Sequence, residues 1–241
     1  MPTAFVAGAT GYTGRAVVRA LVRRRVDTVA HVRPDAPTLA DVTGELQRDG
    51  AVVDTTPWEE AAFTETIARL RPDVVFALLG TTRKRERQAA RAGAPPASYE
   101  AVDYGLTALL LRAATKAGSV SRFVYLSSLG VEESPGAYYA ARRKVEAELR
   151  SSGLAYVIAR PSFITGPDRA EDRPGERIAA TVTDAALSLL GGLGARRLRD
   201  RYASMNAAEL GEALVALALS AREPSVVADA IALRRAAAGS T

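Results

Sequence analysis

The chain has 241 residues, a formal net charge of +5 and no cysteine. Its length suits one large domain, and its 48% apolar content is ordinary for a protein with a buried core. The lack of cysteine excludes disulfides, thiolate nucleophiles and cysteine-ligated metals. We find neither an apolar run of the ~18 residues that a membrane span needs nor a basic leader region, so we expect a cytoplasmic protein without membrane contacts.

Arginine carries nearly all of the positive charge, because Lys84, Lys116 and Lys144 are the only lysines. The basic residues are spread along the chain, and we find neither zinc-finger spacing nor an aromatic-rich RNA-binding motif. We therefore expect no nucleic-acid partner and attribute the charge to an anionic small ligand or a solvated surface. His31 is the only histidine, and we expect it to be packed or solvated in a strand, so no metal site is predicted.

Apolar strand-like runs alternate with helical patterns along most of the chain. We expect strands at residues 4–9, 28–33, 51–54, 73–80, 122–128 and 154–161, and helices at 11–25, 57–70, 97–118, 137–153 and 207–220. This alternation requires crossovers, which give an α/β fold: a doubly wound parallel sheet (Rossmann fold) with strand order 3-2-1-4-5-6. We predict a single domain over residues 1–241, in which residues 162–202 form a small, mostly helical C-terminal cap on the substrate side.

Three glycines follow the first strand in the stretch "VAGATGYTGR". Gly8 permits a tight turn, Gly11 lets a pyrophosphate approach the backbone, and Gly14 allows the helix to pack closely on the strand. The free N–H groups at the helix N-terminus favour a phosphate there. The motif therefore predicts a dinucleotide site, with a tight turn that binds nothing as the alternative. The predicted cofactor-binding residues here are Gly8, Thr10, Gly11, Tyr12, Thr13 and Gly14.

The end of the second strand, "HVRPD", bears on which dinucleotide is bound. An acid at this point suits the ribose 2′-hydroxyl of NAD, whereas an arginine suits the 2′-phosphate of NADP. We predict NADP (NADPH), with Arg33 on the 2′-phosphate and Arg15 as a second candidate. The alternative is a solvated Arg33 and an Asp35 that holds a hydroxyl. Asp54 ends the third strand and is placed to meet the adenine edge, although a role in a turn fits equally well.

Five motifs occur in a characteristic order: "GATGYTGR", "LLGTTR", "RFVYLSSLG", "YYAARRKVEAEL" and "ARPSFITGPDRAEDRPGER". Together they resemble the atypical short-chain dehydrogenases/reductases, a group of NAD(P)H-binding, NmrA-like proteins. The resemblance is strongest to the Tat-interacting-protein oxidoreductases and their bacterial relatives. It covers residues 8–177, about two-thirds of the chain. It implies a Rossmann fold, NADP(H) binding and reductase activity, but no particular substrate.

The resemblance also implies catalytic residues: a serine that polarises a carbonyl, a tyrosine that transfers a proton, and a lysine four residues after the tyrosine. Ser128 is our first choice for the serine. Ser127, beside it, is the second choice and a predicted cofactor contact. The alternative is that both hydroxyls only cap the end of the strand. Tyr138 takes the tyrosine position. Arg142 stands where the family has lysine, so it either stabilises a tyrosinate and reaches the ribose, or indicates a protein that only binds the cofactor. We expect Lys144 to be solvated.

Two further segments are predicted to line the cofactor. Gly80, Thr81 and Thr82 follow the fourth strand, and Pro161, Ser162 and Phe163 leave the sixth. The alternative is that the first set only forms a turn after its strand and that Pro161 only ends its strand. The basic run at residues 83–87 is expected to be a solvated face, with room nearby for an anionic substrate.

We expect an NADP-dependent oxidoreductase that transfers a hydride between NADPH and a small carbonyl or alcohol substrate. The alternative is a non-catalytic or weakly catalytic NADP(H)-binding sensor or regulatory protein. Epimerase work on a nucleotide sugar is less favoured, because the chain is short for it. We expect a monomer or a homodimer. The helices around Leu110 and Val145 are the surfaces by which related folds dimerise, although buried apolar positions there fit a monomer equally well.

Overall fold

The structure, a computed structural model, describes residues 1–81, 87, 91, 97–165, 203–220 and 223–239. They form a seven-stranded sheet in the order β3-β2-β1-β4-β5-β6-β7, and each neighbouring pair is parallel. The strands are β1 (Thr3–Ala7), β2 (Asp27–His31), β3 (Val52–Asp54), β4 (Val74–Ala77), β5 (Arg122–Leu126), β6 (Ala155–Arg160) and β7 (Val226–Asp229). The predicted order of the first six strands is confirmed, and β7 extends the sheet beyond it.

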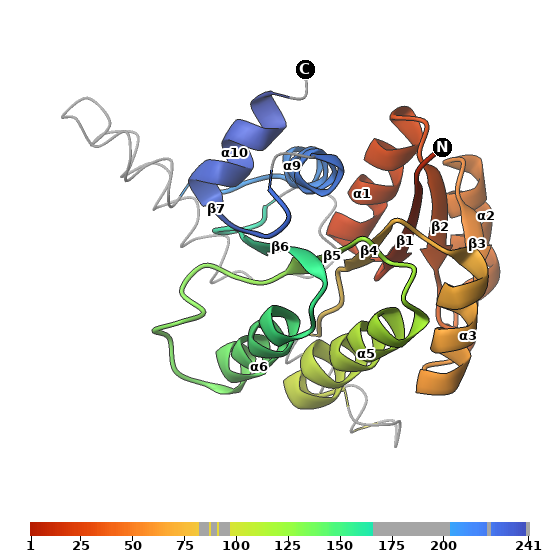
Figure 1. The fold of residues 1–241 in the computed structure, drawn as a ribbon, viewed down its shortest axis with the longest axis horizontal. Coiled ribbons are helices and arrows are strands. Elements are labelled where there is room, and N and C mark those ends of the chain that lie inside the picture. The colour runs from red at the N-terminus through yellow and green to blue at the C-terminus, as the bar shows by residue number, and fades with distance from the viewer. Residues whose placement is uncertain (82–86, 88–90, 92–96, 166–202, 221–222, 240–241) are drawn as a thin grey trace.

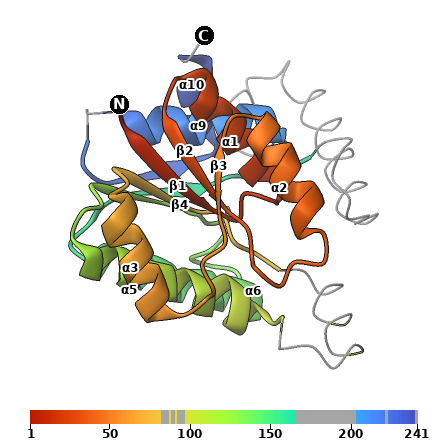
Figure 2. The same cartoon turned by 90° about the vertical axis from the view of Figure 1, so that its right-hand side faces the viewer.

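Helices cover both faces of the sheet (Figures 1 and 2). One face packs against α1 (Tyr12–Arg23), α2 (Leu39–Arg48), α9 (Ala207–Leu219) and α10 (Ala230–Ala238). The other packs against α3 (Glu60–Leu70), the π-helix η1 (Tyr99–Leu106), α5 (Thr107–Ala117) and α6 (Ala137–Ser151). The predicted doubly wound α/β fold is therefore confirmed.

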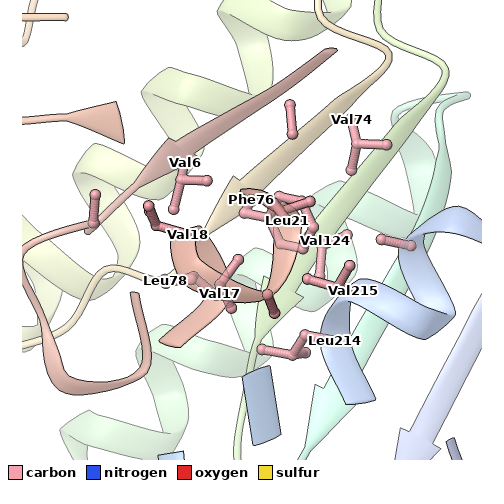
Figure 3. Packing of buried hydrophobic residues seen from close by; sticks show 14 of the residues in the cluster. Val6, Val17, Val18, Leu21, Val74, Phe76, Leu78, Val124, Leu214 and Val215 are labelled. Carbon is pink, nitrogen blue, oxygen red and sulfur yellow. The ribbon is translucent and has the colours of Figure 1, made fainter. Parts of the chain in front are cut away.

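The core consists of two apolar layers, one on each side of the sheet. Alternate residues of a strand point to opposite faces, so Val6 of β1 packs toward α1 whereas Phe5 packs toward α3. Figure 3 shows the first layer, in which Val17 and Leu21 of α1 meet Phe76 of β4. Strands buried on both faces explain why the sequence reads as continuous apolar runs.

The segment predicted as one regular helix over residues 97–118 begins instead with the wider turns of η1 and becomes α-helical at Thr107. Asp103 lies in η1 and is 1% exposed, and its carboxylate accepts a hydrogen bond from the Thr81 backbone N–H at 2.8 Å. The change in helix type thus accompanies a buried polar contact that the apolar pattern does not reveal.

Three elements were not predicted. The polar stretch after β2 contains α2, whose buried residues are only Val42 and Leu46, so its apolar pattern is sparse. Near the C-terminus lie β7 and α10, and Asp229 caps α10 by accepting from the Ala232 N–H at 2.8 Å. Of the predicted cap at 162–202, residues 166–202 lie outside the described part of the chain. Ile164, near its start, forms a parallel bridge with Met205, which lies three residues after its end.

His31 ends β2 and is packed, as one of our two expectations had it. The residue is 2% exposed, and its Nε2 lies 2.8 Å from the Thr56 carbonyl oxygen. The rings of Trp58 and Phe63 surround it, each with its centroid 5.0 Å from the imidazole. His31 therefore belongs to the aromatic core between β2 and α3.

Acidification is expected to destabilise the fold through His31. Burial is the main cause that lowers the pKa of His31 below its ordinary value. The folded protein then binds fewer protons than the unfolded chain, so this contribution to stability is fully present above about pH 6.5 and is lost as the pH falls below it. Urea unfolding at about pH 7.5 and about pH 5.5 measures the loss. His31→Phe keeps a ring in the cluster, and its free energy of unfolding is expected to fall less between these two pH values. An equal fall in both proteins would assign the pH dependence to other groups.

Candidate active site

The glycine turn after β1 has a geometry that other residues do not fit. Gly8 has φ of +87°, and a Cβ there would lie 2.6 Å from the Leu78 carbonyl oxygen. A Cβ on Gly14 would lie 2.0 Å from the Gly8 carbonyl oxygen. The Gly11 N–H donates to that same oxygen at 3.0 Å and closes the turn. The three glycines thus bring the start of α1 directly onto the end of β1, as their spacing predicts.

The N-terminus of α1 carries backbone N–H groups that no described side chain caps. Gly11 is its N-cap, so no side chain caps the first turn, and that turn holds no acidic residue. Its free backbone N–H groups and the positive end of the helix dipole suit an anion. Thr10 is exposed and Thr13 is buried, whereas the Tyr12 hydroxyl donates to the Thr165 carbonyl oxygen at 3.0 Å. Tyr12 therefore links the turn to the segment that leaves β6.

The ends of β2 and β3 hold the two residues predicted to meet the adenosine. Arg33 is exposed, and its NH1 approaches the Asp35 carboxylate only at 3.4 Å, so its guanidinium is accessible. Asp54 accepts from the N–H and the hydroxyl of Thr56, at 3.1 and 3.0 Å. The Asp54 carboxylate thus holds a turn, which is the second of the two roles considered for it.

The end of β4 divides into an exposed and a buried part. Gly80 is exposed, whereas Thr81 is buried and gives its N–H to Asp103. This N–H is therefore occupied within the protein. Thr82, together with most of the basic run at 83–87, lies outside the described residues.

The two serines after β5 have different surroundings. Ser127 is 3% exposed, and its hydroxyl donates to Glu146 Oε1 at 2.6 Å. Burial alone would raise the pKa of Glu146, but hydrogen bonds from Arg160 and Ser127 outweigh it and lower that pKa. Ser128 is half-buried, and its hydroxyl donates to the Leu129 carbonyl oxygen at 3.0 Å. Ser128 is thus the more accessible hydroxyl at this strand end.

Tyr138 and Arg142 lie one helical turn apart on α6. Arg142 Cζ is 4.4 Å from the centroid of the Tyr138 ring. The guanidinium also donates to the Leu126 carbonyl oxygen at 2.6 Å and to Asp103 Oδ1 at 3.0 Å. Lys144 points away from this cluster, because its ammonium pairs with Glu100 at 2.5 Å. The arginine in the lysine position is therefore directed into the protein, beneath the tyrosine.

The exit from β6 completes the carboxyl edge of the sheet. Pro161 is buried, and its carbonyl oxygen accepts from the Leu129 N–H at 2.9 Å. Ser162 donates its hydroxyl to the Ala203 carbonyl oxygen at 2.5 Å, and Phe163 is partly exposed. The segment is thus tied both to the serine loop and to residues 203–205.

Two residues of this region were missed by the sequence analysis. Asp103 and Glu146 are 1% and 2% exposed, and each carries a carboxylate that several donors hold. Glu146 follows Arg142 by four residues, so the two share a helical face, and that spacing was the available signal. Asp103 stood out only as an acid within an apolar helix pattern.

The predicted glycine, serine and proline residues follow β1, β4, β5 and β6, whose carboxyl ends share one edge of the sheet. A Rossmann sheet with an open helix N-terminus at this edge defines a dinucleotide-binding protein. Residues 8–186 match the model of a family described as NAD(P)H-binding. The chain belongs to this NAD(P)H-binding family.

One curated relative is the chloroplastic divinyl chlorophyllide a 8-vinyl-reductase of Oryza sativa subsp. indica. It is 33% identical over 171 residues, which make up 66% of this chain. The match spans only 39% of the reductase's own length.

Similar solved structures include the UDP-glucose 4-epimerase of Thermotoga maritima with UDP-glucose, at a TM-score of 0.61 and 18% identity over 89% of this chain and 72% of that one. A nucleoside-diphosphate-sugar epimerase of Pseudomonas aeruginosa has a TM-score of 0.58 at 16% identity, over 95% and 72% of the two chains. The leucoanthocyanidin reductase–NADPH complex of Vitis vinifera has a TM-score of 0.52 at 19% identity, over 67% and 50%. At these identities the likeness concerns the fold.

The described residues contain neither a membrane-spanning helix nor a cluster of metal ligands. No described helix has the length and apolar character needed to cross a membrane. Within the same residues, no group of three or more histidine, cysteine, aspartate or glutamate side chains could hold a metal ion.

Proposed function

We propose that the protein is an NADP-dependent oxidoreductase that reduces a small carbonyl compound or oxidises the corresponding alcohol. The observation that carries this proposal is the placement of Tyr138 over the Arg142 guanidinium, at 4.4 Å, on a family-typical dinucleotide-binding fold. The rice relative is a reductase by name, which supports this class of reaction. Within the short-chain dehydrogenase-like proteins, the motifs favour the Tat-interacting-protein branch. The location that we propose is the cytoplasm.

The residues present fit such a cofactor. The uncapped N-terminus of α1 would hold the pyrophosphate, Arg33 the 2′-phosphate, and the segments at Gly80 and Pro161 the ribose and the nicotinamide side. The bound cofactor would supply the hydride. Tyr138 would give its hydroxyl proton to the carbonyl oxygen, and the Ser128 hydroxyl would hydrogen-bond that oxygen. Arg142 would stabilise the phenolate that the proton transfer leaves.

The oligomeric state that we propose is a monomer. Leu110 and Val145 are 0% exposed because they face the sheet, so they offer no dimer surface. The outward positions of α5 and α6 carry exposed charged side chains, among them Lys116 and Lys144. A small molecule rather than a nucleic acid or a membrane is the proposed partner.

One observation favours a second candidate, an NADP(H)-binding protein with weak or no turnover. Arg142 donates hydrogen bonds to Tyr125, Leu126 and Asp103, and its side chain is 8% exposed. A guanidinium held in this way does not reach a ribose, although a lysine in this position does so in the family that the sequence resembles. Turnover of NADPH with any aldehyde, ketone or quinone distinguishes the two candidates.

Removal of Arg33 is expected to weaken NADPH binding more than NADH binding. The exposed guanidinium can hold a phosphate in two bonds, and NADH lacks the 2′-phosphate. Calorimetric titration of Arg33→Ala should show about a tenfold or greater loss of NADPH affinity, with NADH affinity nearly unchanged. Arg48→Ala removes another arginine, at the far end of α2, and is expected to change neither. An equal loss for both cofactors would remove Arg33 as the 2′-phosphate ligand.

A further inference from the structure

A buried ion pair lies behind the exposed Gly80 at the carboxyl edge of the sheet. Arg142 NH2 is 3.0 Å from Asp103 Oδ1, and the two side chains are 8% and 0% exposed. A Cβ on Gly80 would lie 3.5 Å from Asp103 Oδ1 and 3.7 Å from Arg142 NH2, so the pair forms the wall behind this residue. Burying two charges costs desolvation that their attraction rarely exceeds, so general stability alone does not explain the pair.

The backbone around Asp103 is arranged to bring its carboxylate inward. Residues 99–106 form a π-helix, which is rare and often found at functional sites. Ser98 caps it by accepting from the Ala101 N–H at 3.1 Å. Asp103 then reaches two elements at once, through Oδ2 to the Thr81 N–H and through Oδ1 to Arg142. The carboxylate joins the end of β4 to α6.

Arg142 remains charged in this buried position. Burial alone would lower its pKa, but the phenolates that Tyr138 and Tyr125 form at high pH, together with the Asp103 carboxylate, outweigh burial and raise it. Its NH1 donates to the Leu126 carbonyl oxygen at 2.6 Å and lies 3.4 Å from the Tyr125 hydroxyl. These contacts place a fixed positive charge beneath the Tyr138 ring.

We propose that Asp103 offsets part of the positive charge of Arg142 beneath Tyr138, while the Leu126 carbonyl oxygen also anchors the guanidinium there. The electrostatic field at the Tyr138 phenol then comes from the Arg142–Asp103 pair, rather than from a single cation such as the lysine of related sites. Removing one partner or the other must therefore change the field at Tyr138 in opposite directions. The catalytic meaning of this arrangement rests on the proposed function, but the electrostatic arrangement does not.

Among the described residues, the groups that face Tyr138 come from three elements. Tyr99 of η1 and Tyr139 of α6 contact its ring, with centroids 5.4 and 5.0 Å away. Arg142 of α6 lies beneath it, and behind Arg142 lie Asp103 of η1 and Tyr125 of β5. Among these groups, Arg142 and Asp103 are the two that carry charge at neutral pH.

The test is the ionisation of Tyr138 in the protein without cofactor, followed at 295 nm after rapid pH jumps. The titration of each variant is compared with that of the same variant carrying Tyr138→Phe. The difference between the two curves isolates Tyr138 from the other seven of the eight tyrosines. Arg142→Met is expected to move the midpoint up by about one pH unit, because a nearby cation is lost. Asp103→Asn is expected to move it down by about half a unit, because the Arg142 charge is no longer offset. The double variant should lie between the two single variants, because the charges of Arg142 and Asp103 act on the phenol in opposite directions.

Two controls separate this effect from a structural one. Lys144→Met removes an exposed cation from the same helix, one that pairs with Glu100, and is expected to leave the midpoint unchanged. Asp103→Asn keeps an oxygen that can accept from the Thr81 N–H, so this variant is expected to fold. If Arg142→Met fails to fold, the direction of the midpoint shift in Asp103→Asn tests the proposal by itself. Shifts of the same sign in both single variants, or no shift in Asp103→Asn, would overturn the proposal.

A separate titration with NADPH distinguishes failure of the proposed function from failure of this inference. Neither Asp103 nor Arg142 is assigned to the cofactor, so Asp103→Asn is expected to bind NADPH within about threefold of the unaltered protein. A protein that does not bind NADPH would refute the proposed function and leave the opposed midpoint shifts intact. Normal NADPH binding without opposed shifts would leave the function and remove Asp103 from it.

Discussion

Gly14→Ala is expected to abolish NADPH binding and to lower the free energy of unfolding by about 3 kcal/mol or more. The added Cβ would lie 2.0 Å from the Gly8 carbonyl oxygen, 2.8 Å from the Gly8 carbonyl carbon and 2.9 Å from Ala9 Cα. All three atoms are backbone, so no side-chain rotation relieves the contact. Only a movement of α1 away from β1 does so, and this movement would displace the N–H groups that face the phosphate.

Gly44→Ala is the matched control for this substitution. Gly44 lies within α2, and a Cβ there would meet no atom within 4 Å. Alanine at this position is expected to stabilise the protein by about 0.5–1 kcal/mol, because glycine is a poor helix former. Chemical denaturation and calorimetry with NADPH measure both variants. A Gly14→Ala protein of unaltered stability and NADPH affinity would contradict the close approach of α1 to β1.

The glycine turn was readable from the sequence because most of its requirements are local. Gly11 and Gly14 approach the backbone of Gly8 and Ala9, a few residues away, whereas Gly8 also approaches the distant Leu78 carbonyl oxygen. The order of apolar runs places the turn after the first strand. The same holds for the strands, which are continuously apolar because both faces of the sheet are covered. Most of the fold could therefore be predicted from local backbone geometry and from the burial of the sheet on both faces.

The polar contacts behind the site were not readable, because their partners are distant in sequence. Asp103 meets Thr81 and Arg142, which are 22 and 39 residues away. Ser127 meets Glu146, 19 residues on, and this contact separates it from the adjacent Ser128. No spacing rule distinguishes two neighbouring serines, and only the packing of α6 on the end of β5 does so.

The register of α6 explains why these contacts form together. Tyr138, Arg142 and Glu146 recur at intervals of four residues and thus share one helical face, toward the carboxyl edge of the sheet. Tyr138 carries the phenol, Arg142 pairs with Asp103, and Glu146 accepts a hydrogen bond from Ser127. One helix face therefore positions both the proposed proton donor and the end of the strand that carries the proposed serine.

Tyr138→Phe is expected to lower NADPH-dependent carbonyl reduction by about a hundredfold to ten-thousandfold, the usual contribution of a positioned acid. The substitution keeps the ring over Arg142 and removes only the hydroxyl, so NADPH affinity is expected to change by less than about threefold. Oxidation of NADPH at 340 nm with aldehydes, ketones and quinones measures the rate. Tyr139→Phe, next to it on α6, serves as control and should retain activity. Full activity in Tyr138→Phe would assign the proton to another group and leave Tyr138 as part of the ring cluster around Arg142.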